Sequence, residues 1–290
     1  MSVSRRRFLT ISAAACVVGG SARAMHQERF VALGAEAQIT LHGDVDFAAR
    51  AFAACRREVE AVEAAFSLWR AHSVLSRLNR EGRVVQPGST FLELAQHATE
   101  MFELSQGGFD PTVQGLWRGG GPVGWRALDV SPSEACFTRE GMSATLNGIA
   151  QGYAADRVIA VLKSLGYRDA LANLGEFRGI GQREDGAPWR IGVEHPFTGE
   201  IAEVIEGVGA VATSEPRGTL VRGKPHIFDP LGRDGERWAS VTVMAETGWR
   251  ADALSTAIAA APVEEAEDLL RHGGATGAVL IDGEGRIARF

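Results

Sequence analysis

The sequence predicts an α+β protein that forms one compact domain after a short leader. Apolar residues recur at helical spacing in the first half of the chain, whereas the second half switches to short β-like runs before helices return. No internal repeat, Pro/Gly/Ser-rich linker or block of like charge divides the 290 residues. The composition, 45% hydrophobic and 23% charged, is that of an ordinary globular chain.

Residues 1–24 have the features of a twin-arginine signal peptide. The pair Arg5 and Arg6 precedes a short, weakly apolar stretch and a small-x-small cleavage site that ends at Ala24. A short membrane anchor, or acylation at Cys16, is the alternative. We therefore expect export by the twin-arginine pathway, a periplasmic location and a mature domain of residues 25–290.

Charge and hydropathy exclude two classes of partner for the mature domain. Cleavage removes four arginines and no acid, which changes the formal net charge from −6 to −10 and leaves no basic footprint for nucleic acid. Beyond the leader, no run reaches the ~18 apolar residues of a membrane span. Cys55 and Cys136 remain, and we expect Cys55 to be a buried apolar side chain rather than half of a disulfide.

The expected elements follow from periodicity, capping residues and turn residues. The first half predicts, in order, an opening strand over 30–41 that Gly34 interrupts and helices over 46–66, 90–105 and 147–165. The second half predicts strands over 170–174, 189–194, 209–214 and 239–245, helices over 251–261 and 263–271, and a final hairpin with a DGEG turn.

The run ADALST, residues 251–256, combines an apolar helix with two oxygen-bearing side chains. Asp252 and Thr256 are four residues apart, so a helix places them one above the other on one face. Such a pair suits a hard cation. The alternative is that Asp252 is a helix N-cap and Thr256 a satisfied core hydroxyl.

Two glycine-containing turns could approach a ligand closely. In GGFDPT, Phe109 and Asp110 follow Gly108; a C-cap glycine followed by an Asp-Pro turn is the structural alternative. In NGIAQGYAAD, a helix start at Asn147 and Gly148 is a natural phosphate cradle, although neither GxGxxG nor a P-loop is present.

The loop KPHIFDPLG places His226 beside Asp229, and such a histidine can act as an acid, a base or a phosphate contact, or be an ordinary surface residue. GxSxG, HExxH and CxxC are all missing from the sequence. A serine triad, zinc peptidase chemistry and thioredoxin-like redox chemistry therefore lack support.

Eight segments, taken in order, resemble the ApbE family of FAD:protein FMN transferases: LGA (33–35), FSLWRAHSVLSRLN (66–79), GGFDPT (107–112), NGIAQGYAAD (147–156), ALANLG (170–175), AVATS (210–214), HIFDPLG (226–232) and ADALST (251–256). The resemblance covers nearly all of the mature chain. It implies a single ApbE-like, T-fold-related domain with mixed antiparallel sheets and flanking helices.

The resemblance implies an Mg²⁺-dependent enzyme that splits the pyrophosphate of FAD. FMN would pass to a threonine or serine of a periplasmic or membrane-bound acceptor flavoprotein, and AMP would be released. The family's twin-arginine-exported variant is linked to nitrous-oxide respiration. Two alternatives stay open: an Mg²⁺-dependent FAD pyrophosphatase, and a flavin-binding carrier without turnover.

The site residues implied by the resemblance fall into three groups. Asp252, Thr256 and the Gly148 carbonyl would hold the metal, which also gives Asp252 a catalytic role. His226 would be a base or a phosphate contact. Flavin and nucleotide contacts would come from Leu33, Trp69, Gly108, Phe109, Asp110, Thr145, Gln151 and Ile227.

The chain departs from the family pattern at several of these positions. The family's MGT is LGA here, its usual tyrosine is Trp69, and a neutral Gln151 stands where a charge is common. More extensive changes give NLGEF at 173–177 and TSEPRG at 213–218. These changes affect the glycine-rich walls of the expected site.

Overall fold

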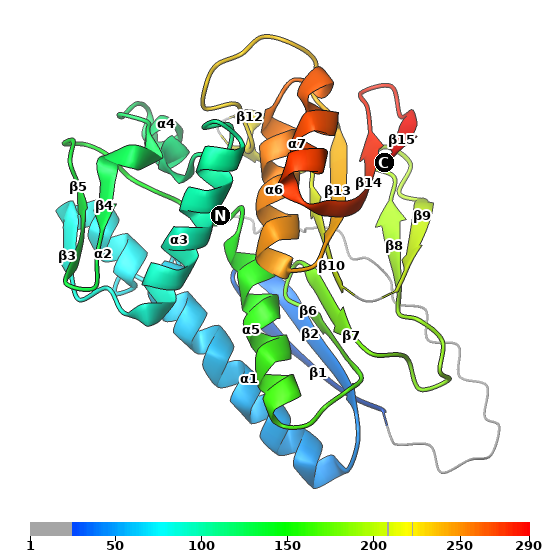
Figure 1. Ribbon diagram of the computed structural model, residues 1–290. Coiled ribbons are helices and arrows are strands. Elements are labelled where there is room, and N and C mark those ends of the chain that lie inside the picture. The colour runs from blue at the N-terminus through cyan, green and yellow to red at the C-terminus, as the bar shows by residue number, and fades with distance from the viewer. Residues whose placement is uncertain (1–24, 208, 222) are drawn as a thin grey trace.

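The computed structural model describes residues 25–207, 209–221 and 223–290, so the expected leader lies outside the described residues. The chain forms one α+β domain around an eight-stranded sheet of order β1-β2-β6-β7-β10-β13-β14-β15, in which neighbouring strands pair antiparallel. The predicted fold class is therefore confirmed. Figure 1 shows the three-stranded sheet β3-β5-β4 and the hairpin β8-β9 at opposite sides of the molecule.

The strands of the large sheet are β1 (Met25–Ala32), β2 (Ala35–His42), β6 (Ala170–Asn173), β7 (Phe177–Ile180), β10 (Gly209–Ser214), β13 (Ser240–Ala245), β14 (Ala275–Ile281) and β15 (Ile287–Arg289). The smaller sheets are made of β3 (Arg83–Val85), β4 (Leu128–Val130), β5 (Glu134–Phe137), β8 (Arg190–Glu194), β9 (Ile201–Glu206), β11 (Leu220–Val221) and β12 (Lys224–Pro225).

The α-helices are α1 (Val45–Phe66), α2 (Val74–Glu81), α3 (Ser89–Leu104), α4 (Gln114–Arg118), α5 (Ala150–Ser164), α6 (Gly248–Ala260) and α7 (Ala266–Gly273), with short 3-10 turns at 111–113, 125–127 and 263–265. Asp44 is the N-cap of α1, and its carboxylate accepts the N–H groups of Asp46 and Phe47. Within the described residues, no helix is both long and apolar enough to cross a bilayer.

Most expected elements are present, but several boundaries were wrong. The single strand expected over 30–41 is a hairpin of β1 and β2, because Leu33 and Gly34 turn the chain with positive φ angles of 51° and 78°. The helix expected from 147 starts only at Ala150, since 147–149 form a turn. α2 was not predicted, and Ser73 caps it by accepting the N–H of Ser76.

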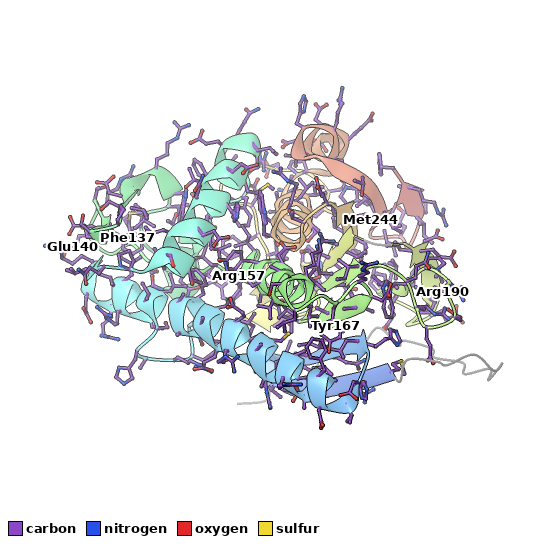
Figure 2. The ribbon with its side chains drawn as sticks, turned by 60° about the horizontal axis from the view of Figure 1, so that its bottom comes forward. Phe137, Glu140, Arg157, Tyr167, Arg190 and Met244 are labelled. Carbon is purple, nitrogen blue, oxygen red and sulfur yellow. The ribbon has the colours of Figure 1, made fainter. Side chains whose placement is uncertain are left out.

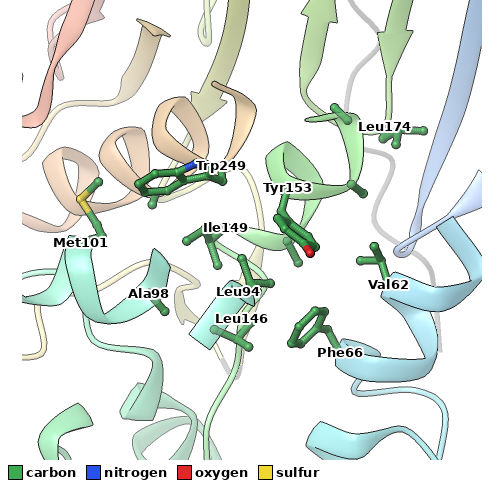
Figure 3. Close-up of a cluster of buried hydrophobic side chains, with 14 of the residues drawn as sticks. Val62, Phe66, Leu94, Ala98, Met101, Leu146, Ile149, Tyr153, Leu174 and Trp249 are labelled. Carbon is green, nitrogen blue, oxygen red and sulfur yellow. The ribbon is translucent and has the colours of Figure 1, made fainter. Parts of the chain in front are cut away.

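The main core joins α1, α3, α5 and α6 (Figure 3). Phe66 at the end of α1 stacks on Phe91 at 5.6 Å and meets Tyr153 of α5 edge-on at 6.4 Å between ring centroids. Cys55 is buried in this core and unpaired, as expected. At the periphery Arg157 of α5 (Figure 2) bonds Glu58 of α1 at 2.9 Å, which further ties the two helices together.

The beginnings of α5 and α6 cross in direct backbone contact (Figure 1). A Cβ atom on Gly152 would lie 2.1 Å from the Gly248 carbonyl oxygen, and one on Gly248 would lie 2.3 Å from the Gly152 carbonyl oxygen. No side chain fits at such separations, so both positions require glycine. This contact fixes how closely the two helices approach.

Gly152→Ala is expected to lower the free energy of unfolding by about 3 kcal/mol or more, because backbone atoms cannot move aside for the methyl group. Gly283→Ala is the matched control, since a Cβ at Gly283 meets nothing within 4 Å. It should change stability by less than about 0.5 kcal/mol. Urea unfolding of both variants measures the difference, and equal effects would contradict the close contact.

Candidate active site at the crossing of two helix starts

Asp252 and Thr256 lie on the face of α6 that meets α5. The Asp252 carboxylate is 3% exposed, and its Oδ2 accepts the Gly152 N–H at 2.9 Å. Thr256 is half-buried, and its Oγ1 donates to the Gly148 carbonyl oxygen at 3.4 Å. The N-cap interpretation of Asp252 is wrong, because α6 begins at Gly248 with Thr247 as its N-cap. The three residues predicted as metal ligands are thus brought together.

Gly148 has to be glycine for this approach. A Cβ there would lie 2.9 Å from both Oγ1 and Cγ2 of Thr256. The absence of a side chain lets the Gly148 carbonyl reach the Thr256 hydroxyl. The result is a small set of oxygen atoms from a backbone carbonyl, a hydroxyl and, one turn away, a carboxylate.

A serine pair that sequence reasoning missed extends this set. Ser214 Oγ, at the end of β10, lies 2.9 Å from Ser255 Oγ and 3.3 Å from Thr256 Oγ1. The sequence did not single out Ser214 and Ser255, because hydroxyl residues are common in strands and helices. The contact shows that the last residue of AVATS lies beside the Thr256 hydroxyl.

His226 is oriented by the turn that follows β10. Its backbone N–H donates to the carbonyls of Pro216 and Thr219, and its ring Nδ1 lies 3.0 Å and 3.2 Å from the same two oxygens. Because both partners are carbonyls, Nδ1 must carry the proton and donate. In this tautomer the lone pair is on Nε2, the form that a base requires.

The loop that follows His226 is fixed by a buried carboxylate. Asp229, whose side chain is 4% exposed, accepts a bond from the Arg233 side chain at 2.7 Å, and Arg233 also pairs with Glu265. Burial alone would raise the pKa of Asp229, but the hydrogen bonds from Arg233 and from the backbone hold it below its usual value. The Arg233 guanidinium lies 3.3 Å from the position a Cβ would take on Gly108. The loop therefore contacts the GGFD turn.

The Asp-Pro turn expected in GGFDPT is present, with Asp110 capping the 3-10 turn at 111–113, but the C-cap of α3 is Ser105 rather than a glycine. Asp110 accepts the backbone N–H groups of Thr112 and Trp125 and the Thr112 hydroxyl, while burial raises its pKa. Phe109 is 5% exposed and its ring packs in the core. The turn is nevertheless joined to the segment before α5, because the Thr145 N–H donates to the Pro111 carbonyl at 2.8 Å.

Asn79 of α2 holds that same segment from the other side. Its amide donates to the Ala144 carbonyl at 2.8 Å and accepts the Ala144 N–H at 2.7 Å. These two bonds satisfy both polar groups of a buried backbone unit. Asn79, the last residue of FSLWRAHSVLSRLN, thus connects α2 with the approach to Gly148.

Leu33 and Trp69 form a separate group at the end of α1. The Leu33 N–H donates to Glu63 at 2.9 Å, and the Trp69 ring lies 3.9 Å from the position of a Cβ on Gly34. Trp69 is 84% exposed, which is unusual for tryptophan and leaves its face open for stacking. Ile227 is half-buried against the main core. Leu33 lies in the turn between β1 and β2 and Trp69 follows α1, whereas Asp252 and Thr256 lie on α6.

The two altered loops bind each other. Glu176 of NLGEF is 6% exposed, and its Oε2 accepts the N–H of Thr213, the first residue of TSEPRG, at 2.9 Å. Gln151 of α5 presses on the same loop, since a Cβ on Gly175 would lie 2.2 Å from the Gln151 amide nitrogen. The altered residues therefore form one connected wall next to the start of α5.

Solved structures similar to this chain share its fold. The ApbE protein from Thermotoga maritima matches with a TM-score of 0.80 and 26% identity, covering 92% of this chain and 97% of the other. The flavinyl transferase ApbE from Pseudomonas stutzeri, in its apo form, matches with a TM-score of 0.79 and 25% identity over 92% and 94% of the two chains. The fold is therefore that of the ApbE proteins.

Sequence comparison is in agreement. The ApbE family model matches residues 33–280. The FAD:protein FMN transferase of Vibrio cholerae is 31% identical over 241 residues, 70% of either chain, and that of Haemophilus influenzae is 28% identical over 247 residues, 69% of this chain and 70% of the relative. The chain belongs to the ApbE family.

Asn79→Ala is expected to destabilise the fold by about 1–3 kcal/mol, because it leaves the buried Ala144 N–H and carbonyl without these partners. Arg80→Ala on the same helix is the control. Its exposed pair with Glu81 should contribute less than about 1 kcal/mol. Thermal unfolding compares the two variants, and an Asn79→Ala protein as stable as the Arg80→Ala protein would contradict the bridging role.

Proposed function

We propose that this ApbE family member is an Mg²⁺-dependent FAD:protein FMN transferase. The acceptor is a threonine or serine of a flavoprotein, and the second product is AMP. The observation that carries the proposal is the convergence of Gly148, Asp252 and Thr256 at the crossing of two helix starts. The names of the relatives from Vibrio cholerae and Haemophilus influenzae supply the reaction class.

The chemistry of the donor set fits magnesium. A carbonyl, a hydroxyl and a carboxylate are hard oxygen ligands, and Mg²⁺ keeps several waters and substrate phosphate oxygens in addition. No group of three or more His, Cys, Asp or Glu side chains suited to a metal occurs in the described part of the chain. Asp252 Oδ2 accepts the Gly152 N–H, and an ionised carboxylate offers two oxygen atoms that act only as acceptors or ligands.

Bound here, Mg²⁺ would neutralise pyrophosphate charge and stabilise the charge that develops at phosphorus. The start of α5, which follows Gly148 in the chain, adds a positive helix-dipole end that favours the same anion. The exposed Trp69 ring provides a stacking surface for the flavin. The chain's own residues thus bind the two parts of FAD, the charged pyrophosphate and the planar ring.

In the reaction, the acceptor hydroxyl oxygen bonds to the FMN-side phosphorus, and the bond from that phosphorus to the bridging oxygen breaks. AMP leaves with the bridging oxygen. His226 Nε2 takes the hydroxyl proton, in the tautomer that the carbonyls of Pro216 and Thr219 enforce. Leu33, Gly108, Phe109, Asp110, Thr145, Gln151 and Ile227 remain the proposed nucleotide and flavin contacts.

We also propose that residues 1–24 direct the folded protein through the twin-arginine pathway. The acceptor would then be periplasmic or membrane-bound. Support comes from the paired arginines and the small-x-small site in the sequence. A fusion of residues 1–24 to a reporter tests this, since replacing Arg5 and Arg6 with lysine should abolish its export.

The transferase is tested by incubating the protein with FAD and Mg²⁺, with and without an acceptor flavoprotein domain taken from the neighbouring genes. AMP release and covalent flavin are followed by mass spectrometry. Acceptor-dependent AMP with a flavinylated peptide is the expected result. AMP that forms equally without acceptor identifies a pyrophosphatase instead, and FAD binding without AMP identifies a carrier.

Asp252→Ala is expected to reduce AMP release at least about 100-fold at every Mg²⁺ concentration, because the metal loses its only charged ligand from the proposed set. The control is Asp268→Ala, which removes an exposed aspartate from α7. It should retain wild-type turnover. Near-normal activity of the Asp252→Ala protein contradicts the proposed metal site.

His226→Ala is expected to lower the transfer rate by about 10²–10⁴ if the imidazole acts as the base. His272→Ala, which removes an exposed histidine of α7, is the control for the loss of an imidazole. A phosphate-binding role would instead act mainly by raising the FAD concentration needed for half-maximal rate.

A further inference from the structure

The contact between α5 and α6 repeats at successive turns of both helices. Gly148 meets Thr256, Gly152 meets Asp252, and Asp156 meets Gly248. Each step of four residues forward along the α5 segment is matched by a step of four back along α6, as in an antiparallel pair in register. The first two steps are the proposed metal site, whereas the third has no assigned role.

The third step is a strong polar contact. Asp156 Oδ1 accepts the Gly248 N–H at 2.8 Å, and its Oδ2 accepts the Trp249 N–H at 3.0 Å. Thr247, the N-cap of α6, makes no side-chain capping bond. The first N–H groups of α6 are therefore satisfied by a carboxylate from α5 rather than from α6 itself.

Asp156 is itself anchored to the sheet. Arg178 of β7, with a side chain only 13% exposed, donates to Asp156 Oδ1 at 3.0 Å. Burial raises the pKa of Asp156, while the two N–H bonds and Arg178 oppose that rise. The carboxylate is thus held from the sheet side and directs its oxygens at the start of α6.

We propose that Asp156 is a positioning residue that sets the register of α6 on α5. It thereby brings the Thr256 hydroxyl and the Asp252 carboxylate to the Gly148 carbonyl. The glycine contact between Gly152 and Gly248 fixes how close the helices are, but it does not by itself prevent α6 from sliding or rotating. Two charge-assisted hydrogen bonds, from the Gly248 and Trp249 N–H groups to the Asp156 carboxylate, hold the start of α6 against both motions. The link to a metal rests on the proposed function.

The register is tested without metal or FAD by amide hydrogen exchange at Gly152. This N–H donates to Asp252 of α6, and Gly152 lies one helical turn before Asp156 in α5, so its exchange reports a shift of α6 away from the mutated residue. In Asp156→Ala we expect exchange at Gly152 to be at least about tenfold faster. Asp156→Asn keeps one acceptor oxygen, so its exchange rate at Gly152 should lie between those of Asp156→Ala and the wild type. This variant replaces Asp156→Ala in the test if the alanine variant does not fold. Glu58→Ala, which removes the partner of the adjacent Arg157, is the matched control and should leave Gly152 unchanged.

The effect on the metal site is measured with Mn²⁺ as the probe, by electron paramagnetic resonance of the free ion. Asp156→Ala should bind Mn²⁺ about tenfold more weakly than the wild type or Glu58→Ala, the size expected when support of a metal ligand is lost. Faster exchange confined to Gly248 and Trp249, with Gly152 and Mn²⁺ affinity unchanged, would overturn the proposal. If the wild type binds no Mn²⁺ but Asp156→Ala still speeds exchange at Gly152, the proposed metal site is contradicted. The proposed role of Asp156 in the register of α6 is then supported on its own.

Discussion

The contact between the Gly152 and Gly248 backbones is the constraint on which the site depends. It lets two helix starts cross without intervening side chains, so that each helix can bond the other's N–H groups. Asp252 of α6 binds Gly152, and Asp156 of α5 binds Gly248. The crossing therefore brings the positive dipole end of α5 close to a small group of oxygens, a combination suited to a pyrophosphate with its counter-cation.

The remaining walls are attached to this crossing by the sheet and by polar contacts. β10 ends at Ser214, beside Thr256, and the turn after it orients His226 through two carbonyls. Glu176 accepts the Thr213 N–H and so connects the two loops in which this chain departs from its family. The changed residues at 173–177 and 213–218 therefore form one connected structure. A buried acid that binds the Thr213 N–H gives the altered wall an internal support.

Much of the fold follows from sequence, because the long helices have clear periodicity. α1 and α3 were predicted to within one residue at each end, and the final hairpin by its DGEG turn. The turn at Leu33 was missed because leucine rarely adopts a positive φ angle, and the late start of α5 was missed because its N-cap, Ile149, is not a capping residue type. For the site, the spacing of Asp252 and Thr256 indicated a shared face, but Ser214, Asp156 and Glu176 could not be assigned, since their partners lie far away in the chain. The four-residue spacing of Gly148, Gly152 and Asp156 was the available signal for the register.

A crystal of the mature protein soaked with Mn²⁺ and FAD provides the most direct measurement of the central claim. Anomalous scattering locates the ion independently of the protein atoms. The account predicts a peak within coordination distance of Asp252, Thr256 and the Gly148 carbonyl, against the pyrophosphate. An ion bound elsewhere, or bound flavin with no ion between these oxygens and its phosphates, would contradict it.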